Sequence, residues 1–255
     1  MSDRDLPSSE YDAAGDFYLN FITTQLATPD SFFHQNVEIM MRMLGDVKGL
    51  QVCDLACGEG FLSRILATQG GIVTGVDLSA TLLHHAVRQS PELAVAYVRD
   101  DVQSLASVDD ASFDAVVCHM ALMDISDLDA TIKTVHRILK VRGAFVFCVL
   151  HPCFESPFNV DSPPHELDDE GNLMAIRVTR YSEEGKWFSG GSGVRGTLGS
   201  IHRKLSTYLN SLIRAGFAIA EISEPALQSA VVDTFDKQLR HVAPRVLIVK
   251  AVKPL

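Results

Sequence analysis

Short apolar runs alternate with amphipathic segments along most of the chain. The runs lie at residues 50–55, 71–77, 94–98, 113–118 and 144–150, and their length and composition predict buried strands. Apolar residues recur at helical spacing over residues 61–68, 80–89 and 127–139, between these runs. Strands that alternate with helices predict an α/β fold built on a parallel sheet.

The same analysis extends to both ends of the chain. Residues 1–10 are polar and are expected to be loose, and residues 32–44 have the spacing of a helix that packs on the sheet. Residues 205–215 form a clear amphipathic helix, and residues 217–222 and 245–252 predict two final strands. A short helix is expected over residues 231–239 in the connection between these strands.

The segment LQVCDLACGEG, residues 50–60, predicts a strand that leads into a ligand-binding loop. Small residues at 56, 58 and 60 leave the backbone open to a ligand. Asp54 stands at the mouth of this loop, where its carboxylate would repel a pyrophosphate and attract an ammonium or a sulfonium. From Gly58 to Ser63 the loop reads G-x-G-x-x-S, and both features favour a sulfonium ligand over NAD.

Five segments in order make this indication specific: VCDLACGEG, VTGVDLS, YVRDDVQSL, FDAVVCHMALMDI and HRILKVRGAFVFCVLHPCF. Together they resemble the motif series of class I S-adenosylmethionine-dependent methyltransferases of the small-molecule type, over roughly residues 50–155. The chain departs from this family at Ala56, where many members have glycine, and at residues 141–143, where Lys-Pro-Gly is usual. The resemblance implies a Rossmann-like, seven-stranded, mostly parallel sheet with an antiparallel last strand, helices on both faces and a cap inserted after the fifth strand.

The resemblance also implies S-adenosyl-L-methionine as cofactor and assigns roles to several residues. Asp77 is expected to bind the ribose hydroxyls, Asp101 to accept from the adenine amino group, and the Val102 amide to reach a ring nitrogen. Tyr11, Phe17 and Tyr18 either close over the cofactor or pack the first helix. The complete predicted cofactor site consists of Tyr18, Asp54, Ala56, Gly58, Asp77, Leu78, Asp101, Val102, Cys118 and His119.

Two histidines are candidate catalytic residues, because histidine titrates near neutrality and each follows a predicted strand. His119 and His151 either remove a proton from the acceptor or only line the site. The proline- and glycine-rich residues 151–200 are expected to form a substrate cap, with a short hairpin within residues 172–188. Its predicted substrate residues are Phe154, Tyr181 and Trp187.

Length and composition bound the remaining possibilities. We expect one methyltransferase domain over residues 1–255, with a helical N-terminal part (1–49), a cofactor core (50–150), the cap (151–200) and a C-terminal part (201–255). A net charge of −10 disfavours nucleic acid as partner. Five cysteines, no signal peptide and no membrane span predict a reduced, cytoplasmic protein without a metal, while monomer and homodimer stay open.

Several functions are compatible with these features. The first is methyl transfer to oxygen, nitrogen or carbon of a small aromatic or apolar metabolite. A tRNA-base methyltransferase is the alternative, and it would depend on a basic cluster of Arg177, Arg180, Lys186, Arg195, Arg203 and Lys204. A non-catalytic partner subunit is a third hypothesis, and it would be expected to lose the cofactor acids. A dehydrogenase is the fourth, against which Asp54 argues.

Overall fold

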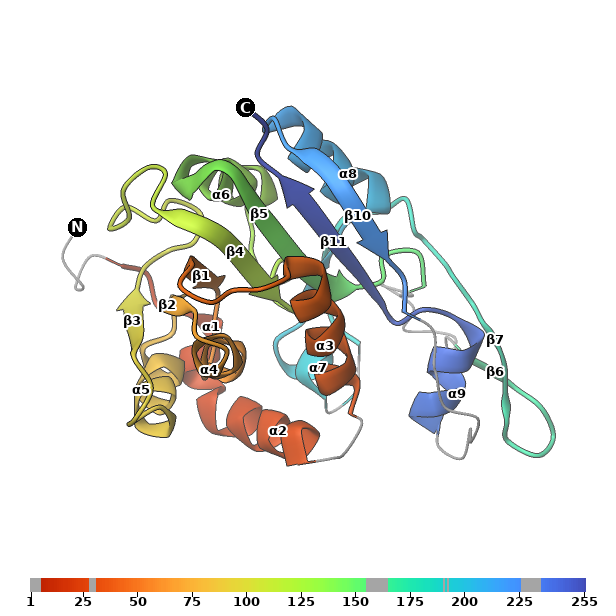
Figure 1. The fold of residues 1–255 in the computed structure, drawn as a ribbon. Helices are drawn as coiled ribbons and strands as arrows, with labels where there is room; N and C mark the ends of the chain where they lie inside the picture. Colours follow the sequence, from red (N-terminus) through yellow and green to blue (C-terminus); the bar gives the residue numbers. More distant parts are fainter. Residues whose placement is uncertain (1–5, 28–30, 155–164, 190, 192, 226–234) are drawn as a thin grey trace.

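A seven-stranded sheet forms the centre of the protein (Figure 1). The computed structural model describes residues 6–27, 31–154, 165–189, 191, 193–225 and 235–255. The strands are β1 (Gln51–Leu55), β2 (Ile72–Asp77), β3 (Val95–Arg99), β4 (Phe113–His119), β5 (Leu139–Leu150), β10 (Ala218–Ser223) and β11 (Val246–Val252), in the order β10-β11-β5-β4-β1-β2-β3. Strands β1 to β5 pair in parallel, whereas β11 lies antiparallel between β5 and β10. The predicted mostly parallel sheet with an antiparallel last strand is therefore confirmed.

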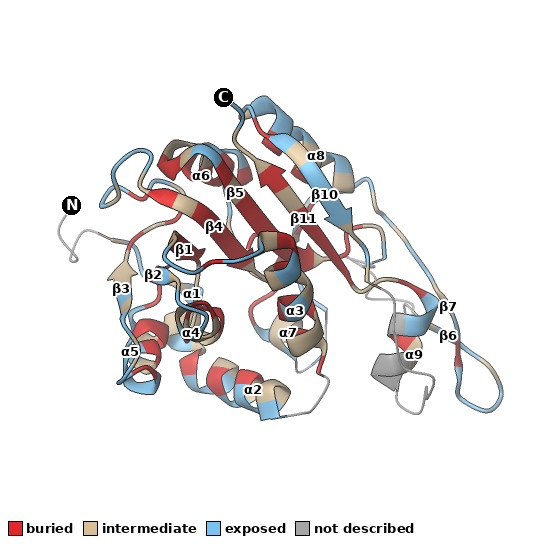
Figure 2. Ribbon diagram, viewed as in Figure 1, coloured by how far each residue is buried: buried red, intermediate tan, exposed pale blue. Residues whose placement is uncertain are grey.

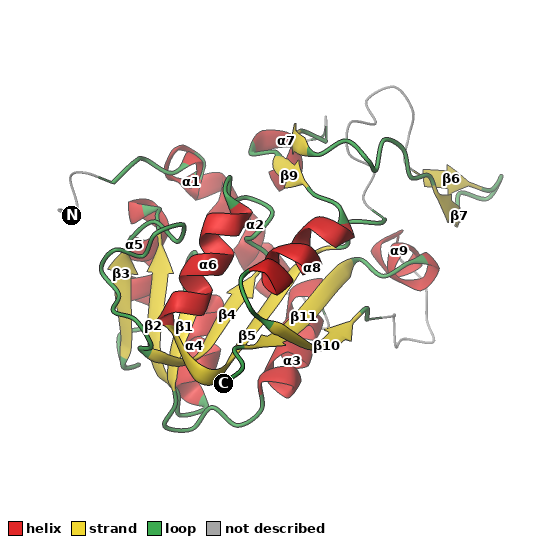
Figure 3. Cartoon of the chain, turned by 90° about the horizontal axis from the view of Figure 1, so that it is seen from above, coloured by secondary structure: helices red, strands yellow, loops and turns green. Residues whose placement is uncertain are grey.

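Helices cover both faces of this sheet, as Figure 3 shows from above. The helices α3 (Phe32–Leu44), α4 (Phe61–Thr68), α5 (Ala80–Gln89), α6 (Leu128–Ile138) and α8 (Leu205–Arg214) lie close to the predicted ranges. Two separate buried clusters form, one with α3 and α4 and the other with α6 and α8. Successive strand residues point to opposite faces, so Val52 packs in the first cluster and Cys53 in the second. Figure 2 shows this burial along the central strands.

The junction between α6 and β5 differs from the prediction. We expected the helix to continue to Leu139 and the strand to begin after Gly143, but Leu139 is already extended and pairs with Phe113. Arg142 then takes a left-handed conformation, with φ 66°. An apolar residue such as Leu139 is buried in either a helix or a strand, so periodicity cannot distinguish the two.

The segment after β5 forms two small sheets. The hairpin predicted within residues 172–188 is therefore wrong. Strand β7 (Leu173–Ile176) pairs with β6 (His165–Leu167), and β8 (Gly185–Trp187) pairs with β9 (Ser200–His202). Helix α7 (Val194–Thr197) precedes β9, and α9 (Phe235–Val242) packs near β7. The observed helix α9 thus ends after the predicted range of 231–239. Residues 231–234 of that prediction lie outside the described part of the chain.

The N-terminal segment forms two helices, and the first of them is hydrogen-bonded to the start of α5. These are α1 (Glu10–Ala13) and α2 (Gly15–Ala27). Asp12 Oδ1 accepts hydrogen bonds from the Ser79 hydroxyl at 2.7 Å and from the Thr81 N–H at 3.1 Å, at the start of α5. The N-terminal helices are thus held beside the loop that follows β2. Within the described residues, no helix combines the length and the apolar character needed to cross a membrane.

Candidate functional site

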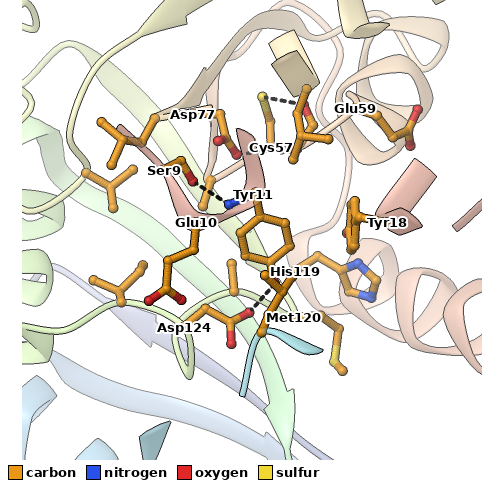
Figure 4. Close-up of a pocket in the computed structure, with 18 of the residues that line it drawn as sticks. Ser9, Glu10, Tyr11, Tyr18, Cys57, Glu59, Asp77, His119, Met120 and Asp124 are labelled. Atoms are coloured by element: carbon orange, nitrogen blue, oxygen red, sulfur yellow. Dashed lines mark hydrogen bonds between the residues drawn. The ribbon is translucent and has the colours of Figure 1, made fainter. Parts of the chain in front are cut away.

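A cavity of about 380 Å³ opens where β1, β2 and β4 end (Figure 4). Its wall is formed by the loop after β1, the ends of β2 and β4, the N-terminal helices and the strand β9. Because parallel strands end at one edge of the sheet, residues far apart in sequence meet here. The cavity therefore lies where ligands bind in open α/β folds.

The loop after β1 turns back over the strand end through left-handed residues. Ala56 has φ 56°, Gly58 has φ 56° and Gly60 has φ 81°. A Cβ atom on Gly60 would lie 2.4 Å from the Tyr97 hydroxyl, so only glycine fits there. Ala56 adopts its conformation against the steric preference of an L-residue, which is the local cost of the missing glycine.

Asp54 lies buried at the base of the cavity. Its Oδ2 accepts a hydrogen bond from the Ser63 hydroxyl at 2.6 Å. Burial raises the pKa of this carboxyl to about 7, although the bond from Ser63 acts in the opposite direction. Asp54 is thus poised to ionise when a positive charge arrives beside it.

Asp77 ends β2 and is held rigidly by the backbone. Its Oδ2 accepts from the Gly58 N–H and its Oδ1 accepts from the Ser79 N–H, both at 2.8 Å. Burial raises the pKa of Asp77 above its ordinary value, while these backbone bonds oppose that rise. Each carboxylate oxygen keeps a lone pair for a further donor, as binding of two ribose hydroxyls requires.

The turn after β3 offers an acceptor and a donor side by side. Asp101 Oδ1 accepts from the Gln103 N–H at 2.9 Å, which orients this carboxylate. Val102 is buried, and its backbone N–H donates to no described residue. A buried donor without a partner is costly unless a ligand supplies an acceptor. This pair fits the edge of an adenine ring, with its amino group toward Asp101.

The structure brings most of the predicted cofactor residues together. The cavity wall includes Tyr18, Asp54, Ala56, Gly58, Asp77, Leu78, Asp101, Val102 and His119. Cys118 does not line it, because its side chain is buried in the cluster between the sheet and α6. The donors and acceptors at the wall therefore fit the expected adenosine-containing cofactor. Among the residues described, no group of three His, Cys, Asp or Glu could hold a metal ion.

The two candidate histidines have different environments. His119 lines the cavity, and its ring contacts Phe33 edge-to-face with the ring centroids 5.5 Å apart. Burial lowers the pKa of His119 to about 4, and its Nε2 is buried without a hydrogen-bond partner. His151 is buried outside the cavity wall, with Nε2 2.7 Å from Glu224 Oε1. Its Nδ1 accepts from the Cys153 N–H, so both ring nitrogens of His151 are engaged.

The three predicted substrate residues lie away from the cavity wall. The Phe154 ring packs against His151, with the ring planes tilted by 43° and the centroids 4.7 Å apart. The Tyr181 hydroxyl accepts from the Leu205 N–H at 2.9 Å. Trp187 is buried, and its indole N–H has no partner among the described residues. A direct substrate role for this group stays a prediction.

Other residues form the part of the wall that the sequence did not reveal. They include Ile22 and Phe33 before the sheet, Asp124 after β4, and Lys186, Leu198, Ser200 and Ile201 in the segment after β5. The Tyr11 hydroxyl donates to Asp124 Oδ2 at 2.9 Å, and the Arg195 guanidinium donates to Asp124 Oδ1. Burial raises the pKa of both Tyr11 and Asp124. Asp124 thereby joins the N-terminal segment to the segment after β5 across the cavity.

Comparisons with known proteins agree with this geometry. A family model described as a methyltransferase domain matches residues 53–147. The crystal structure of an S-adenosylmethionine dependent methyltransferase from Mesorhizobium loti is 31% identical, with a TM-score of 0.72, and the match covers 84% of this chain and 96% of that one.

Two curated relatives match over a shorter stretch. A malonyl-[acyl-carrier protein] O-methyltransferase of Pseudescherichia vulneris is 34% identical over 46% of this chain and 45% of its own length. A ubiquinone biosynthesis O-methyltransferase of Alkalilimnicola ehrlichii is 32% identical over 45% of this chain and 47% of its own length. The match thus spans about half the length of these two relatives.

Proposed function

Because this chain belongs to the class I S-adenosylmethionine-dependent methyltransferases, with S-adenosylmethionine as cofactor, we propose that it methylates an oxygen, nitrogen or carbon atom of a small aromatic or apolar metabolite. One observation carries this substrate class. Beside polar residues such as Glu10 and Asp124, the wall beyond the cofactor residues carries rings and apolar side chains, among them Tyr11, Ile22, Phe33, Met120, Leu198 and Ile201. Such a surface favours a ligand that buries apolar area.

The chain's own residues can orient the cofactor and exclude water from the acceptor. The cofactor supplies a methyl group already activated on a positively charged sulfur. Asp77, Asp101 and the Val102 N–H would hold the adenosine portion and would thereby set the direction of transfer. The enclosing N-terminal segment excludes water from the acceptor.

His119 is suited to orient the acceptor. With a pKa of about 4 its imidazole is uncharged at neutral pH, so it can accept or donate one hydrogen bond without carrying charge. A hydroxyl or amine bound to it would be fixed in position for an in-line displacement. We therefore assign His119 as an orienting residue and not as the base that removes the proton.

The alternative of a tRNA-base methyltransferase loses its main support. Arg177, Arg180, Lys186 and Arg195 of the basic cluster form ion pairs with Glu166, Glu183, Glu10 and Asp124. Arg203 is buried and donates to the carbonyls of Leu122, Ile125 and Ser126. A cluster used in this way offers little positive surface to a phosphate backbone.

A direct assay tests the proposed substrate class. The purified protein is incubated with S-adenosylmethionine and a small-molecule extract of its source cells, and mass spectrometry records which compounds gain one methyl group. We expect the gain in aromatic or apolar compounds. A gain confined to tRNA nucleosides in a parallel incubation with total tRNA would contradict the proposal. An Asp77→Asn variant, weakened in cofactor binding, identifies background methylation.

A further inference from the structure

The cavity wall has far more acidic than basic side chains. Its carboxyl groups are Glu10, Asp54, Glu59, Asp77, Asp101 and Asp124, whereas Lys186 is the only lysine or arginine among the described residues that line it. Asp54, Asp77 and Asp101 stand at the cofactor positions. Glu10 and Asp124 lie toward the aromatic part of the wall, close to Tyr11 (Figure 4).

The cations beside this wall are bound to carboxylates or carbonyls of the protein. Arg99 donates to the Leu78 carbonyl, and the buried Arg203 donates to the carbonyls of Leu122, Ile125 and Ser126. Lys186 forms an ion pair with Glu10. Arg195 donates to Asp124 and also to the Gly199 carbonyl at 3.1 Å.

The same is true at the loop after β1. Arg64 Nη2 lies 2.7 Å from Glu59 Oε2, and Arg64 Nη1 donates to the Glu59 carbonyl at 2.6 Å. Lys186, Arg195 and Arg64 therefore neutralise carboxylates of the protein itself. They leave no spare positive charge for a ligand among the described residues that line the cavity.

Histidine does not supply the missing charge. His119 is the one histidine in the wall, and its ring lies against Phe33 in a buried position. Because burial holds its pKa near 4, the ring stays uncharged at neutral pH. Among the described residues, an anion in this cavity would meet no cation that is not already bound to the protein, and the carboxylates of Asp77 and Asp101, which form no ion pair, would repel it.

From this charge arrangement we infer that the methyl acceptor is an uncharged or cationic molecule, such as a phenol or an amine, and that it carries no carboxylate or phosphate. The inference rests on the proposed function and narrows its substrate class. The cofactor's own carboxylate differs, because the same molecule brings an ammonium and a sulfonium into the cavity. An anionic acceptor would bring no such compensation.

Ion-exchange fractionation tests the inference. A small-molecule extract is divided at pH 7 into compounds retained by an anion exchanger, compounds retained by a cation exchanger and compounds retained by neither. Each fraction is incubated with the protein and methyl-labelled S-adenosylmethionine. We expect label in acceptors of the cation-exchange or unretained fraction. Label only in the anion-exchange fraction overturns the inference, and label in no fraction overturns the proposed function beneath it.

A charge variant tests the physical cause. Glu10→Gln removes the partner of Lys186 and so leaves a lysine ammonium unpaired at the wall. The probe is a carboxylated analogue of the acceptor found above, measured as a competitive inhibitor. We expect its inhibition constant to fall by ~5-fold or more, since one new charge pair is gained.

A matched control keeps this result interpretable. Glu183→Gln removes the partner of Arg180, which forms an equally exposed ion pair outside the cavity wall. The control is expected to leave the inhibition constant within twofold. An unchanged constant in Glu10→Gln, or an equal fall in both variants, would overturn the inferred charge selection.

Discussion

Tyr11 and Asp124 are joined by a hydrogen bond of 2.9 Å although 113 residues separate them in sequence. Tyr11 belongs to the first helix, and Asp124 follows β4 at the carboxyl edge of the sheet. The Tyr11 ring and the Asp124 carboxylate both line the cavity, and Figure 4 shows the hydrogen bond between them. The bond thus holds the N-terminal segment against the cavity that we propose as the cofactor site.

Tyr11→Phe is expected to weaken cofactor binding without unfolding the protein. Loss of a hydrogen bond to a charged group costs about 1.5 to 3 kcal/mol, and part of this cost falls on the closed form of the N-terminal segment. We expect S-adenosylmethionine affinity to fall by ~5- to 30-fold in calorimetry. Tyr97→Phe is the control, because the Tyr97 hydroxyl bonds to Ser90 outside the cavity wall. Equal affinity in Tyr11→Phe and the unchanged protein would contradict this role.

Asp54 predicts a pH-dependent affinity. Burial raises its pKa to about 7, and a nearby ammonium or sulfonium favours the ionised form. S-adenosylmethionine should therefore bind more tightly as the pH rises from 6 to 8, with release of a proton near pH 7. Calorimetry in two buffers of different ionisation enthalpy measures that proton. The uncharged 5′-methylthioadenosine is the control ligand, and an equal pH dependence for both ligands would refute the role of Asp54.

The same pKa has a consequence for stability. The folded value of about 7 lies above the ordinary carboxyl value of about 3.9, so the folded protein holds more protons than the unfolded chain between these limits. Asp54 therefore lowers the free energy of unfolding as the pH rises from about 4 to 7. Thermal unfolding of Asp54→Asn without cofactor should lack this part of the pH dependence.

Ala56 is strained by its left-handed conformation. At φ 56° an L-residue loses roughly 1 to 2 kcal/mol relative to its preferred regions, whereas glycine loses about 0.5 to 1 kcal/mol in chain entropy. Ala56→Gly is thus expected to raise the free energy of unfolding by up to ~1 kcal/mol in chemical denaturation. Ala67→Gly within α4 should lower it by about the same amount. Destabilisation by both variants would show that Ala56 is not strained.

Substitution of His119 is expected to change turnover, whereas substitution of His151 is expected to change stability. His119→Ala is expected to lower turnover by ~10- to 100-fold, and His119→Asn should recover part of it because an amide still forms hydrogen bonds. His151→Asn breaks the contact with Glu224, so we expect lower stability and cofactor affinity within twofold. Steady-state rates and thermal unfolding measure both. A large turnover loss in His151→Asn alone would instead return the catalytic role to His151.

Local patterns predicted the sheet, and the meeting of three acids at one of its edges, for a physical reason. Asp54, Asp77 and Asp101 each follow a short apolar run, and parallel strands bring their carboxyl ends to one edge. Strand position therefore brings these side chains to one edge, while the family resemblance singled out Asp101 within its acidic turn. The beginning of β5 was missed because Leu139 is buried in a helix and in a strand alike.

The acceptor end of the cavity could not be predicted in this way. Phe33 and Ile201 reach the wall only because α3 and β9 pack where they do, and the helical spacing of residues 32–44 does not show that Phe33 faces a cavity. Asp124 and Arg195 are 71 residues apart, so their ion pair depends on tertiary packing. Trp187 was assigned to the substrate from its aromatic character; its buried side chain does not line the cavity, and its role stays a prediction.

A crystal structure with bound S-adenosylhomocysteine tests the central claim most directly. The account predicts ribose hydroxyls on the Asp77 carboxylate, the adenine amino group on Asp101, and an adenine ring nitrogen within about 3 Å of the Val102 nitrogen. The sulfur should face His119 and Met120. A ligand bound outside this cavity, or an adenine ring that leaves the Val102 N–H without a partner, would contradict it.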